Sequence, residues 1–198
     1  MAEITAADVK KLRDKTGLGM MVCKEALKAS DGDADKAVEY LRKKGLDAAS
    51  KRAGRQTSEG IIGSYIHVTG KIGVMVEVNC ESDFVARNDD FKAMAKDIAM
   101  HIAATDPIAV AAEDVAADVV EREREIYRDQ VKNKPPEITE KIVDGKLKKF
   151  FAERCLLEQP FVKNTDVTVG DMIKDVMAKL GENMSVRRFV RYELGEDL

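Results

Sequence analysis

The sequence predicts an α+β fold in which a small helical domain precedes a three-stranded antiparallel sheet packed with helices. Apolar residues recur at helical spacing in three short N-terminal segments, and strict alternation begins at Ser58. Alternation returns at 184–194, after a middle region of helical periodicity. We therefore divide the chain into a three-helix N-terminal domain that contacts a partner (1–46), a linker (47–57) and a core domain that also dimerises (58–198).

The N-terminal domain carries start and stop signals for each helix. Thr5 is a good N-cap with Asp8 three residues on, and the glycines of segment 16–19 end the first helix. A second helix opens at Met20, and a third is expected to end at Gly45. Three short helices enclose only a small core, so this domain is expected to rest on the remaining chain or on a partner.

The linker and the methionines leave alternatives open. Segment 47–57 is small, polar and basic, which is typical of a solvated linker, although its cations could touch an acidic partner. Met20 and Met21 follow a glycine turn, where flexible thioethers suit either an adaptable contact surface or the domain core.

Three alternating segments predict the sheet. Segments 61–68 and 72–80 are joined by Thr69-Gly70-Lys71 as a hairpin, and 184–194 supplies a third strand. One face is expected to bury against helices, and the other to carry Tyr65, His67, Met75 and Phe189 among Arg187 and Arg191. A mixed second face with exposed strand edges favours a second layer, most simply another copy of the chain.

Helices are expected to fill the region between the hairpin and the last strand. Asp106-Pro107 ends the first of them, Pro135-Pro136 separates the next two, and Gly145 is expected to weaken the third. The expected helices cover 91–102, 113–132, 137–157 and 169–180, with an extended segment at 159–162.

Composition excludes several classes of protein. The net charge of −3 has both signs interspersed, and only 5% of residues are aromatic, so a nucleic-acid surface is not expected. Apolar windows are too short for a membrane span, and the first residues lack the features of a signal peptide. Cys23, Cys80 and Cys155 form no CxxC pair, which indicates reduced thiols in a cytoplasmic protein.

The chain is poor in catalytic machinery. It has no phosphate-binding loop, dinucleotide fingerprint, nucleophile elbow or zinc box. His67 and His101 lack ligand spacing, and His101 is expected to be a structural histidine with its hydrogen bonds satisfied. The carboxylates at 81, 83, 89 and 90 could in principle hold Mg²⁺, but their position at a helix start already favours acidic residues. We expect neither an enzyme nor a bound metal or cofactor.

The segment Asn79–Asn88 is the most informative part of the chain. It joins a strand to a helix that opens near Asp89, and binding residues concentrate in such loops. Two interpretations stand on the residues alone. Either Ser82 or Asp83 caps the next helix while Phe84 tucks beneath it, or Phe84 is displayed to a partner.

Four motifs resemble the elongation factor Ts family. The resemblance covers the whole chain in order, and the first two motifs are long enough to be specific. Ser82 stands where the family usually has threonine, which keeps the hydroxyl group. The chain is similar to compact members with one core subdomain, in contrast to longer members with two subdomains and a coiled-coil hairpin. The matching segments are Thr16–Leu27, Gly73–Asn88, Phe161–Lys163 and Gly181–Phe189.

The resemblance implies a guanine-nucleotide exchange factor for elongation factor Tu, a translation GTPase. In the family, the loop of Ser82, Asp83, Phe84 and Val85 enters the GTPase beside its Mg²⁺ site and promotes GDP release. Phe84 would wedge between two helices, and Asp83 would hydrogen-bond nearby. The N-terminal domain resembles ubiquitin-associated domains and would grip a further helix. That grip would use Leu12, Met20 and Met21, and compact members would act as homodimers.

Two other functions are weighed against exchange. The first is a helical adaptor without exchange activity, which would bind a ubiquitin-like or helical peptide through the N-terminal domain alone. The second is a metal-dependent hydrolase that uses the cluster at Glu81 and Asp83. Only exchange predicts faster release of GDP from elongation factor Tu.

Overall fold

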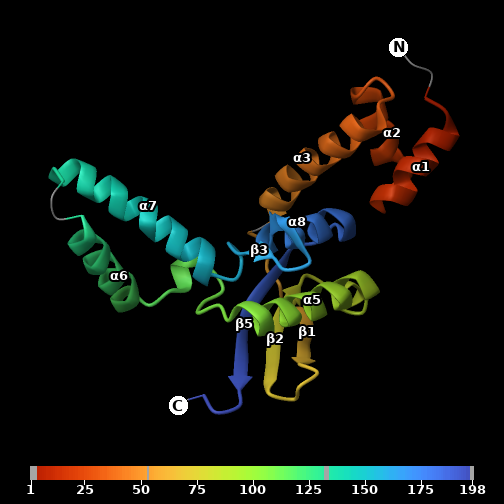
Figure 1. Ribbon diagram of the computed structural model, residues 1–198. Coiled ribbons are helices and arrows are strands. Elements are labelled where there is room, and N and C mark those ends of the chain that lie inside the picture. The colour runs from red at the N-terminus through yellow and green to blue at the C-terminus, as the bar shows by residue number, and fades with distance from the viewer. Residues whose placement is uncertain (1–3, 53, 132–133, 197–198) are drawn as a thin grey trace.

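The computed structural model describes residues 4–52, 54–131 and 134–196, and its α+β architecture confirms the predicted fold class. A three-helix domain lies above a three-stranded sheet covered on one face by helices (Figure 1). The elements in order are α1 (Ala6–Thr16), α2 (Met20–Ala29), α3 (Ala34–Arg52), β1 (Glu59–Ile66), β2 (Ile72–Cys80), α4 (Asp83–Ala86), α5 (Asp89–Thr105), the 3₁₀ turn η1 (Ala112–Asp114), α6 (Ala117–Gln130), α7 (Pro136–Arg154), β3 (Pro160–Phe161), β4 (Asn164–Thr168), α8 (Val169–Leu180) and β5 (Met184–Glu193).

The N-terminal domain has the predicted caps and a core of its own. Thr5 and Asp8 form a capping box, and Gly17 ends α1 with a φ of 70°, a conformation that suits glycine. The helices are consistent with a ubiquitin-associated-like domain. Their shared core consists of Val9, Leu12, Cys23, Ala26, Leu27, Ala37 and Leu41.

The predicted end of the third helix at Gly45 is wrong, because α3 continues to Arg52. Glycine lowers helix propensity by only about 1 kcal/mol, which packing overrides. That packing is close: a Cβ on Gly45 would lie 3.0 Å from the Cβ of Ala178 in α8. Helix therefore occupies much of the segment expected to be a linker, and the division at 46–57 stays a prediction.

The N-terminal domain rests on α8, as its small core led us to expect. A Cβ on Gly17 would lie 2.9 Å from Cε of Lys179, so the lysine side chain runs against the turn between α1 and α2. The same lysine pairs with Asp90 at the start of α5, at 2.8 Å. A cavity of about 390 Å³ remains between α3 and α8.

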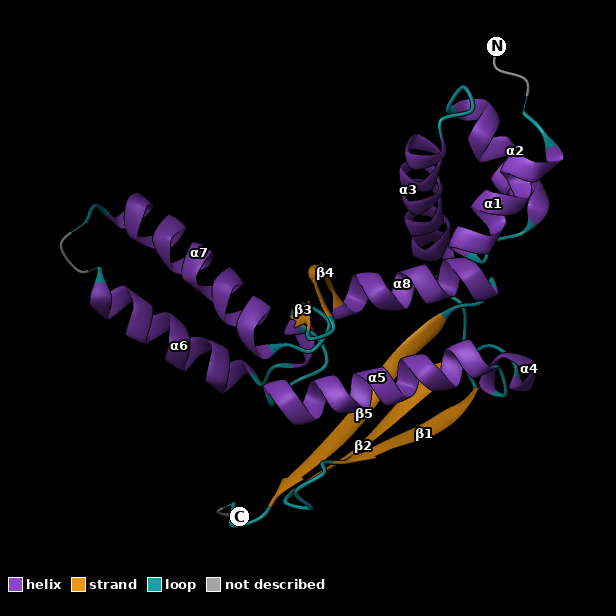
Figure 2. Cartoon of the chain, turned by 45° about the vertical axis from the view of Figure 1, so that its right-hand side comes forward, coloured by secondary structure: helices purple, strands orange, loops and turns teal. Residues whose placement is uncertain are grey.

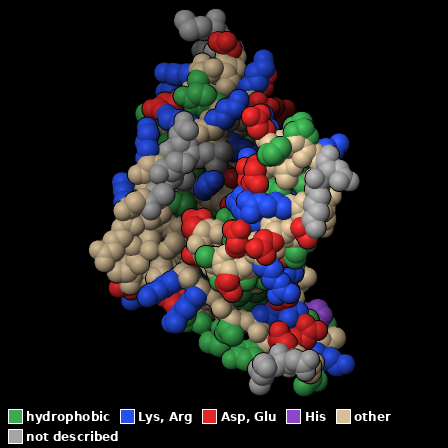
Figure 3. Space-filling model, turned by 90° about the vertical axis from the view of Figure 1, so that its left-hand side faces the viewer, with side chains coloured by type: hydrophobic (Ala, Val, Ile, Leu, Met, Phe, Trp, Pro, Cys, Tyr) green, Lys and Arg blue, Asp and Glu red, His purple; other side chains and the backbone are tan. Residues whose placement is uncertain are grey.

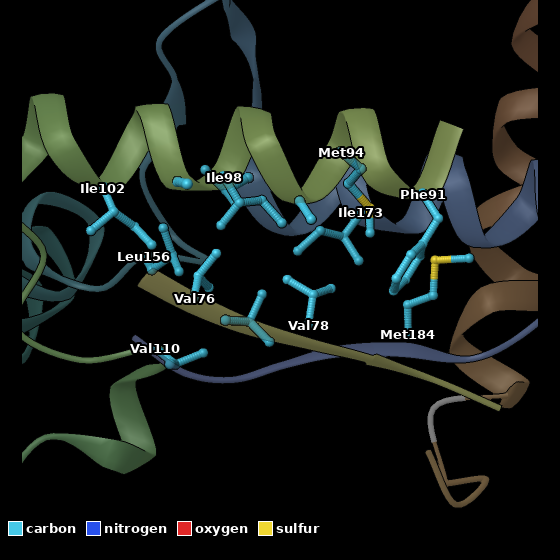
Figure 4. Close-up of a cluster of buried hydrophobic side chains, with 14 of the residues drawn as sticks. Val76, Val78, Phe91, Met94, Ile98, Ile102, Val110, Leu156, Ile173 and Met184 are labelled. Atoms are coloured by element: carbon cyan, nitrogen blue, oxygen red, sulfur yellow. The ribbon is translucent and has the colours of Figure 1, made fainter. Parts of the chain in front are cut away.

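The sheet has the order β1-β2-β5, with each neighbour antiparallel. Helices α5 and α8 both cover the same face, and the core lies between them and the strands (Figure 4). Apolar side chains from β2 and β5 meet those of the two helices there, each at most 5% exposed: Val76, Val78, Phe91, Met94, Ile98, Ile102, Ile173 and Met184.

The predicted assignment of side chains to the two sheet faces is partly wrong. The β1–β2 register pairs Tyr65 with Val74, so Tyr65 lies on the covered face with the core. In β5 a bulge inserts Arg187 between the partners of Val78 and Glu77. The extra residue reverses the alternation and turns Phe189 toward the core. An alternating pattern read without its register cannot reveal such a reversal.

The opposite face of the sheet carries exposed apolar side chains. We call this surface the open face and define it by Ile62, Ile66, Met75, Val190 and Tyr192, which the register places on one side. Each is between 39% and 68% exposed. In the described part of the chain no helix covers this face, and exposed apolar patches of this kind mark interaction surfaces (Figure 2).

Helices α6 and α7 form an antiparallel hairpin that projects from the core (Figure 2). The resemblance to compact family members did not predict this hairpin. Gly145 does not interrupt α7. The helix predicted at 113–132 begins at Ala117, four residues after its predicted start, and its predicted end at Lys132 lies outside the described residues. Acidic and basic side chains intersperse on this side of the molecule (Figure 3), with Arg128 bonded to Glu140 at 2.9 Å.

The extended segment at 159–162 proves to be part of a small hairpin, β3–β4, that the sequence did not predict. Cys23, Cys80 and Cys155 are free, in agreement with the prediction, and the structure adds that each is buried. Within the described residues, no helix combines the length and the apolar character that spanning a bilayer requires.

His101 is a buried structural histidine, as predicted. Its Nε2 lies 2.8 Å from Oε1 of Gln159, and its Nδ1 accepts from the backbone N–H of Val162 at 3.3 Å. Burial lowers the pKa of His101 from its ordinary value of 6.5, although the hydrogen bond to Gln159 partly opposes this effect. The imidazole is therefore neutral in the folded protein at pH 7.

We expect stability to fall as the pH drops below about 6.5, because the unfolded chain then binds a proton that folded His101 resists. The contribution is present above that pH and is lost as the pH falls toward the folded pKa. His101→Asn should reduce the change in the free energy of unfolding between pH 7 and pH 5, measured by urea denaturation. His67→Asn, at a half-buried position beside Tyr65, is the control, and an unchanged slope in the His101 variant would contradict the assignment.

Candidate functional site

The Phe84 loop, residues Ser82–Arg87, lies where β2 ends and before α5 begins. Ser82 caps the single-turn helix α4, with its Oγ accepting from the N–H of Val85 at 3.4 Å. Asn88 then caps α5 by accepting from the N–H of Asp90 at 2.8 Å. Ser82 is a cap, but of the single turn α4, which was not predicted; the helix that opens near Asp89 is capped by Asn88 and not by Ser82 or Asp83.

Phe84 is displayed to solvent. Its side chain is 83% exposed, whereas Val85 and Ala86 beside it are 9% and 7% exposed. Of the two interpretations of this segment, the one in which Phe84 tucks beneath a helix is therefore wrong. A single turn of helix has room to bury one side, and the two smaller apolar residues occupy it. An aromatic ring held in water at the tip of an ordered turn is a feature of binding surfaces.

Residues of the α8–β5 turn hold the loop from behind. The carboxylate of Glu182 accepts from the N–H of Ser82 at 3.0 Å and from its Oγ–H at 2.6 Å. In the opposite direction, the N–H of Asn183 donates to Oε1 of Glu81 at 2.6 Å. Sequence analysis missed these contacts, although Glu182 and Asn183 both lie in a segment that matches the family.

Cys80 supports the loop from the end of β2. Burial is the main cause that raises the pKa of its thiol to about 11. The thiol is therefore protonated at neutral pH, and its Sγ donates to the carbonyl oxygen of Ser82 at 3.1 Å. Ser82 is thus held through its N–H, its hydroxyl and its carbonyl.

The acidic residues of the loop already have cationic partners. Asp83 pairs with Arg87 at 3.0 Å, and Glu81 pairs with Arg55 at 3.4 Å. Among the residues that the structure describes, no group of three or more His, Cys, Asp and Glu side chains is placed to hold a metal ion. The hydrolase hypothesis had rested on Glu81 and Asp83 as ligands, and the observed ion pairs give it no support.

The N-terminal methionines and Leu12 lie in different environments. Met20 and Met21 are 42% and 69% exposed, in the first turn of α2, so the alternative that placed them in the core is not supported. Leu12 is 2% exposed and packs inside the domain. Its side chain is not available to a partner, and we correct the expectation of a direct contact to one of support for α1.

The helices that carry the exposed aromatic ring and the exposed methionines lie toward one end of the molecule. Helix α4 is at the same end of the core as α1 and α2, whereas the α6–α7 hairpin projects from the opposite side (Figure 1 and Figure 2). The C-terminal end of α8 lies between the two parts, since Lys179 touches Gly17 and Glu182 bonds Ser82. A single large partner could therefore contact both.

Comparison with known proteins identifies the family. A family model described as "Elongation factor TS" matches residues 24–196. The chain belongs to the elongation factor Ts family. A protein of that name from Desulfosudis oleivorans is 61% identical over 99% of this chain and 100% of its own length. Elongation factor Ts from Geobacter metallireducens is 60% identical over 98% of this chain and 91% of its own.

The family match covers the Phe84 loop but not the exposed methionines of the N-terminal domain. It includes the whole Phe84 loop and the α8–β5 turn, but it begins at residue 24, after Met20 and Met21. The full-length relatives extend across the N-terminal domain, and elongation factor Ts from Syntrophus aciditrophicus is 56% identical over 98% of both chains. Membership in the family therefore does not rest on the core domain alone.

Replacing Phe84 with alanine should leave folding intact, because a side chain in water loses little on truncation. We expect the free energy of unfolding to change by less than about 0.5 kcal/mol. Phe91→Ala is the matched control, since Phe91 is 0% exposed and its truncation should cost roughly 3–5 kcal/mol. Urea denaturation measures both, and a large loss in the Phe84 variant would show that the ring is packed in solution.

Proposed function

We propose that this protein is a guanine-nucleotide exchange factor for elongation factor Tu, acting in the cytoplasm during translation. The observation that carries the proposal is the exposed, rigidly mounted Phe84 in a chain of the elongation factor Ts family. The two exposed methionines on the same side supply a second attachment. The proposed partner-contacting residues are Ser82, Asp83, Phe84, Met20 and Met21, while the buried Val85 supports the loop from its inner side.

The proposed mechanism needs no bond chemistry. A GTPase holds GDP through backbone amides and a lysine around the phosphates and through Mg²⁺. An aromatic side chain inserted between neighbouring helices would shift them, and would weaken the Mg²⁺ site and the phosphate site together. Asp83 is tied to Arg87, so entry of the loop into the partner would exchange this surface ion pair for new contacts.

The energy that exchange requires indicates why two attachments are needed. Nanomolar nucleotide binding corresponds to about 12 kcal/mol. Weakening it by about four decades requires roughly 5.5 kcal/mol of preference for the nucleotide-free GTPase. A single aromatic hot spot contributes about 2–4 kcal/mol to binding at a typical interface. The N-terminal domain must therefore contribute the rest of the required preference for the nucleotide-free GTPase. Nucleotide binding then expels the factor by the same ratio, which lets it act repeatedly.

Phe84→Ala should lower the maximal rate of labelled GDP release from elongation factor Tu by roughly thirtyfold, the effect of losing one interface hot spot. Complex formation with nucleotide-free elongation factor Tu should weaken far less, because the N-terminal contact remains. Stopped-flow fluorescence with a labelled GDP measures the rate.

Ile138→Ala, which truncates an exposed residue of the hairpin, is the control and should release GDP like the wild type. A wild-type protein that leaves GDP release unchanged would refute the exchange function. Retention of complex formation without any exchange would favour the adaptor alternative.

We further propose that the open face pairs two copies of the chain. All three strands contribute apolar side chains to this face. Glu77 of β2 lies among them and is paired with Arg188 of β5 at 2.8 Å. The compact family members that this chain resembles are expected to complete their core in this way. A two-fold axis through the face would bring each apolar residue against the same surface of the other copy.

Met75→Arg should convert the proposed dimer to a monomer, because a buried unpaired charge at the centre of the interface costs several kcal/mol. Sedimentation velocity at micromolar concentration measures the change. Ile126→Arg, at a hairpin position that is 42% exposed, should leave the dimer intact. A wild-type protein that sediments as a monomer at this concentration would contradict the proposal.

A further inference from the structure

We propose that Glu182 is a positioning residue for exchange, in that it holds the Phe84 loop in the orientation that enters the partner. The inference rests on the proposed exchange function. Glu182 is not among the proposed partner contacts. Its effect on Phe84 would pass through its two hydrogen bonds to Ser82.

The position of Phe84 has to be determined by its neighbours. A ring that is 83% exposed makes few contacts that could define where it points. Its orientation follows from α4, and α4 is a single turn of four residues, too short to be stable alone. The turn is held on one side by the burial of Val85 and Ala86 and at its start by its cap, Ser82.

Both oxygens of Glu182 are used on Ser82. Oε2 accepts from the backbone N–H and Oε1 accepts from the hydroxyl, so the carboxylate fixes the backbone and the side-chain rotamer together. With its proton directed to Glu182, the Ser82 hydroxyl presents a lone pair to the N–H of Val85. The carboxylate therefore orients the hydroxyl for capping, and loss of the carboxylate would free both the rotamer and the cap.

Glu182 itself is firmly placed. Gly181 ends α8 with a φ of 81° and turns the chain toward β5, a conformation that favours glycine. The next residue, Asn183, is 5% exposed, donates from its N–H to Glu81 and donates from Nδ2 to the carbonyl oxygen of Arg55 at 2.7 Å. Each of the two segments thus gives an N–H to a carboxylate of the other.

The same end of α8 also supports the N-terminal domain. Lys179 lies against Gly17 and pairs with Asp90, only a few residues from Glu182. Glu182 therefore ties the Phe84 loop to the element on which the other proposed contact rests. Fixing the distance between two contacts on one partner lowers the entropy lost on binding, and this is how a remote carboxylate affects exchange.

Three variants of the full-length protein test the role. Glu182→Ala removes both hydrogen bonds and should lower the maximal rate of GDP release by about tenfold, with a smaller change in the concentration that gives half the maximal rate. Glu182→Gln can still accept from the N–H of Ser82, and it should lose only about threefold. Adding Ser82→Ala to Glu182→Ala should slow release by less than Ser82→Ala does in the wild type, since the two residues share one contact.

Amide hydrogen exchange supplies a readout that does not depend on the partner. In Glu182→Ala, the hydrogen-bonded amides of Val85, Ala86 and Arg87 should exchange at least about tenfold faster, while those of α5 stay protected. Glu153→Ala, on the exposed side of α7, is the control and should match the wild type in both assays. Should Glu182→Ala fold poorly, the Gln variant carries the same comparison.

The outcomes separate the two proposals. Unchanged amide exchange in the loop, or a maximal release rate equal to the wild type, would overturn the positioning role while leaving exchange in place. A wild-type protein without exchange activity would refute the proposed function. In that case faster amide hydrogen exchange in Glu182→Ala would still establish that Glu182 orders the loop. Its proposed role in nucleotide exchange would be refuted.

Discussion

The packing of α5 and α8 against a single face of the three-stranded sheet is the constraint on which the rest of the structure depends. Because only the single turn α4 separates β2 from α5, and α5 must turn back over the sheet, this connection lies at the end of the core, where Phe84 projects into water. Because both helices take the same face, the other face keeps its apolar side chains exposed. The exposed ring of Phe84 and the open face thus arise from the same packing.

The exposure of Phe84 has a cost that folding alone does not explain. Burying a phenylalanine side chain contributes about 2–3 kcal/mol, and this ring forgoes it while Val85 and Ala86 beside it are buried. The protein nevertheless holds the ring's segment with caps, a carboxylate and a buried thiol. A segment ordered in this way around an exposed aromatic ring favours a role in binding, in which the ring is buried against another protein.

Helix α8 connects the parts that the proposed function requires to act together. It covers the sheet through Ile173 and Met177, it supports the N-terminal domain near Gly45, and its C-terminal turn clamps Ser82. The α6–α7 hairpin projects from the other side of the molecule (Figure 2). Coupling between the two proposed contacts is therefore mediated by one helix and the turn that follows it.

By itself the sequence determined the features that depend on neighbouring residues: the fold class, the cap at Ser82, the helix end at Gly17 and the family motifs. It did not determine which way Phe84 points, that Phe189 faces the core after the bulge at Arg187, or that α3 passes through Gly45. Caps and alternation act over a few residues along the chain. Glu182 and Ser82 are 100 residues apart, and only the packing of α8 against the sheet brings that carboxylate to that hydroxyl.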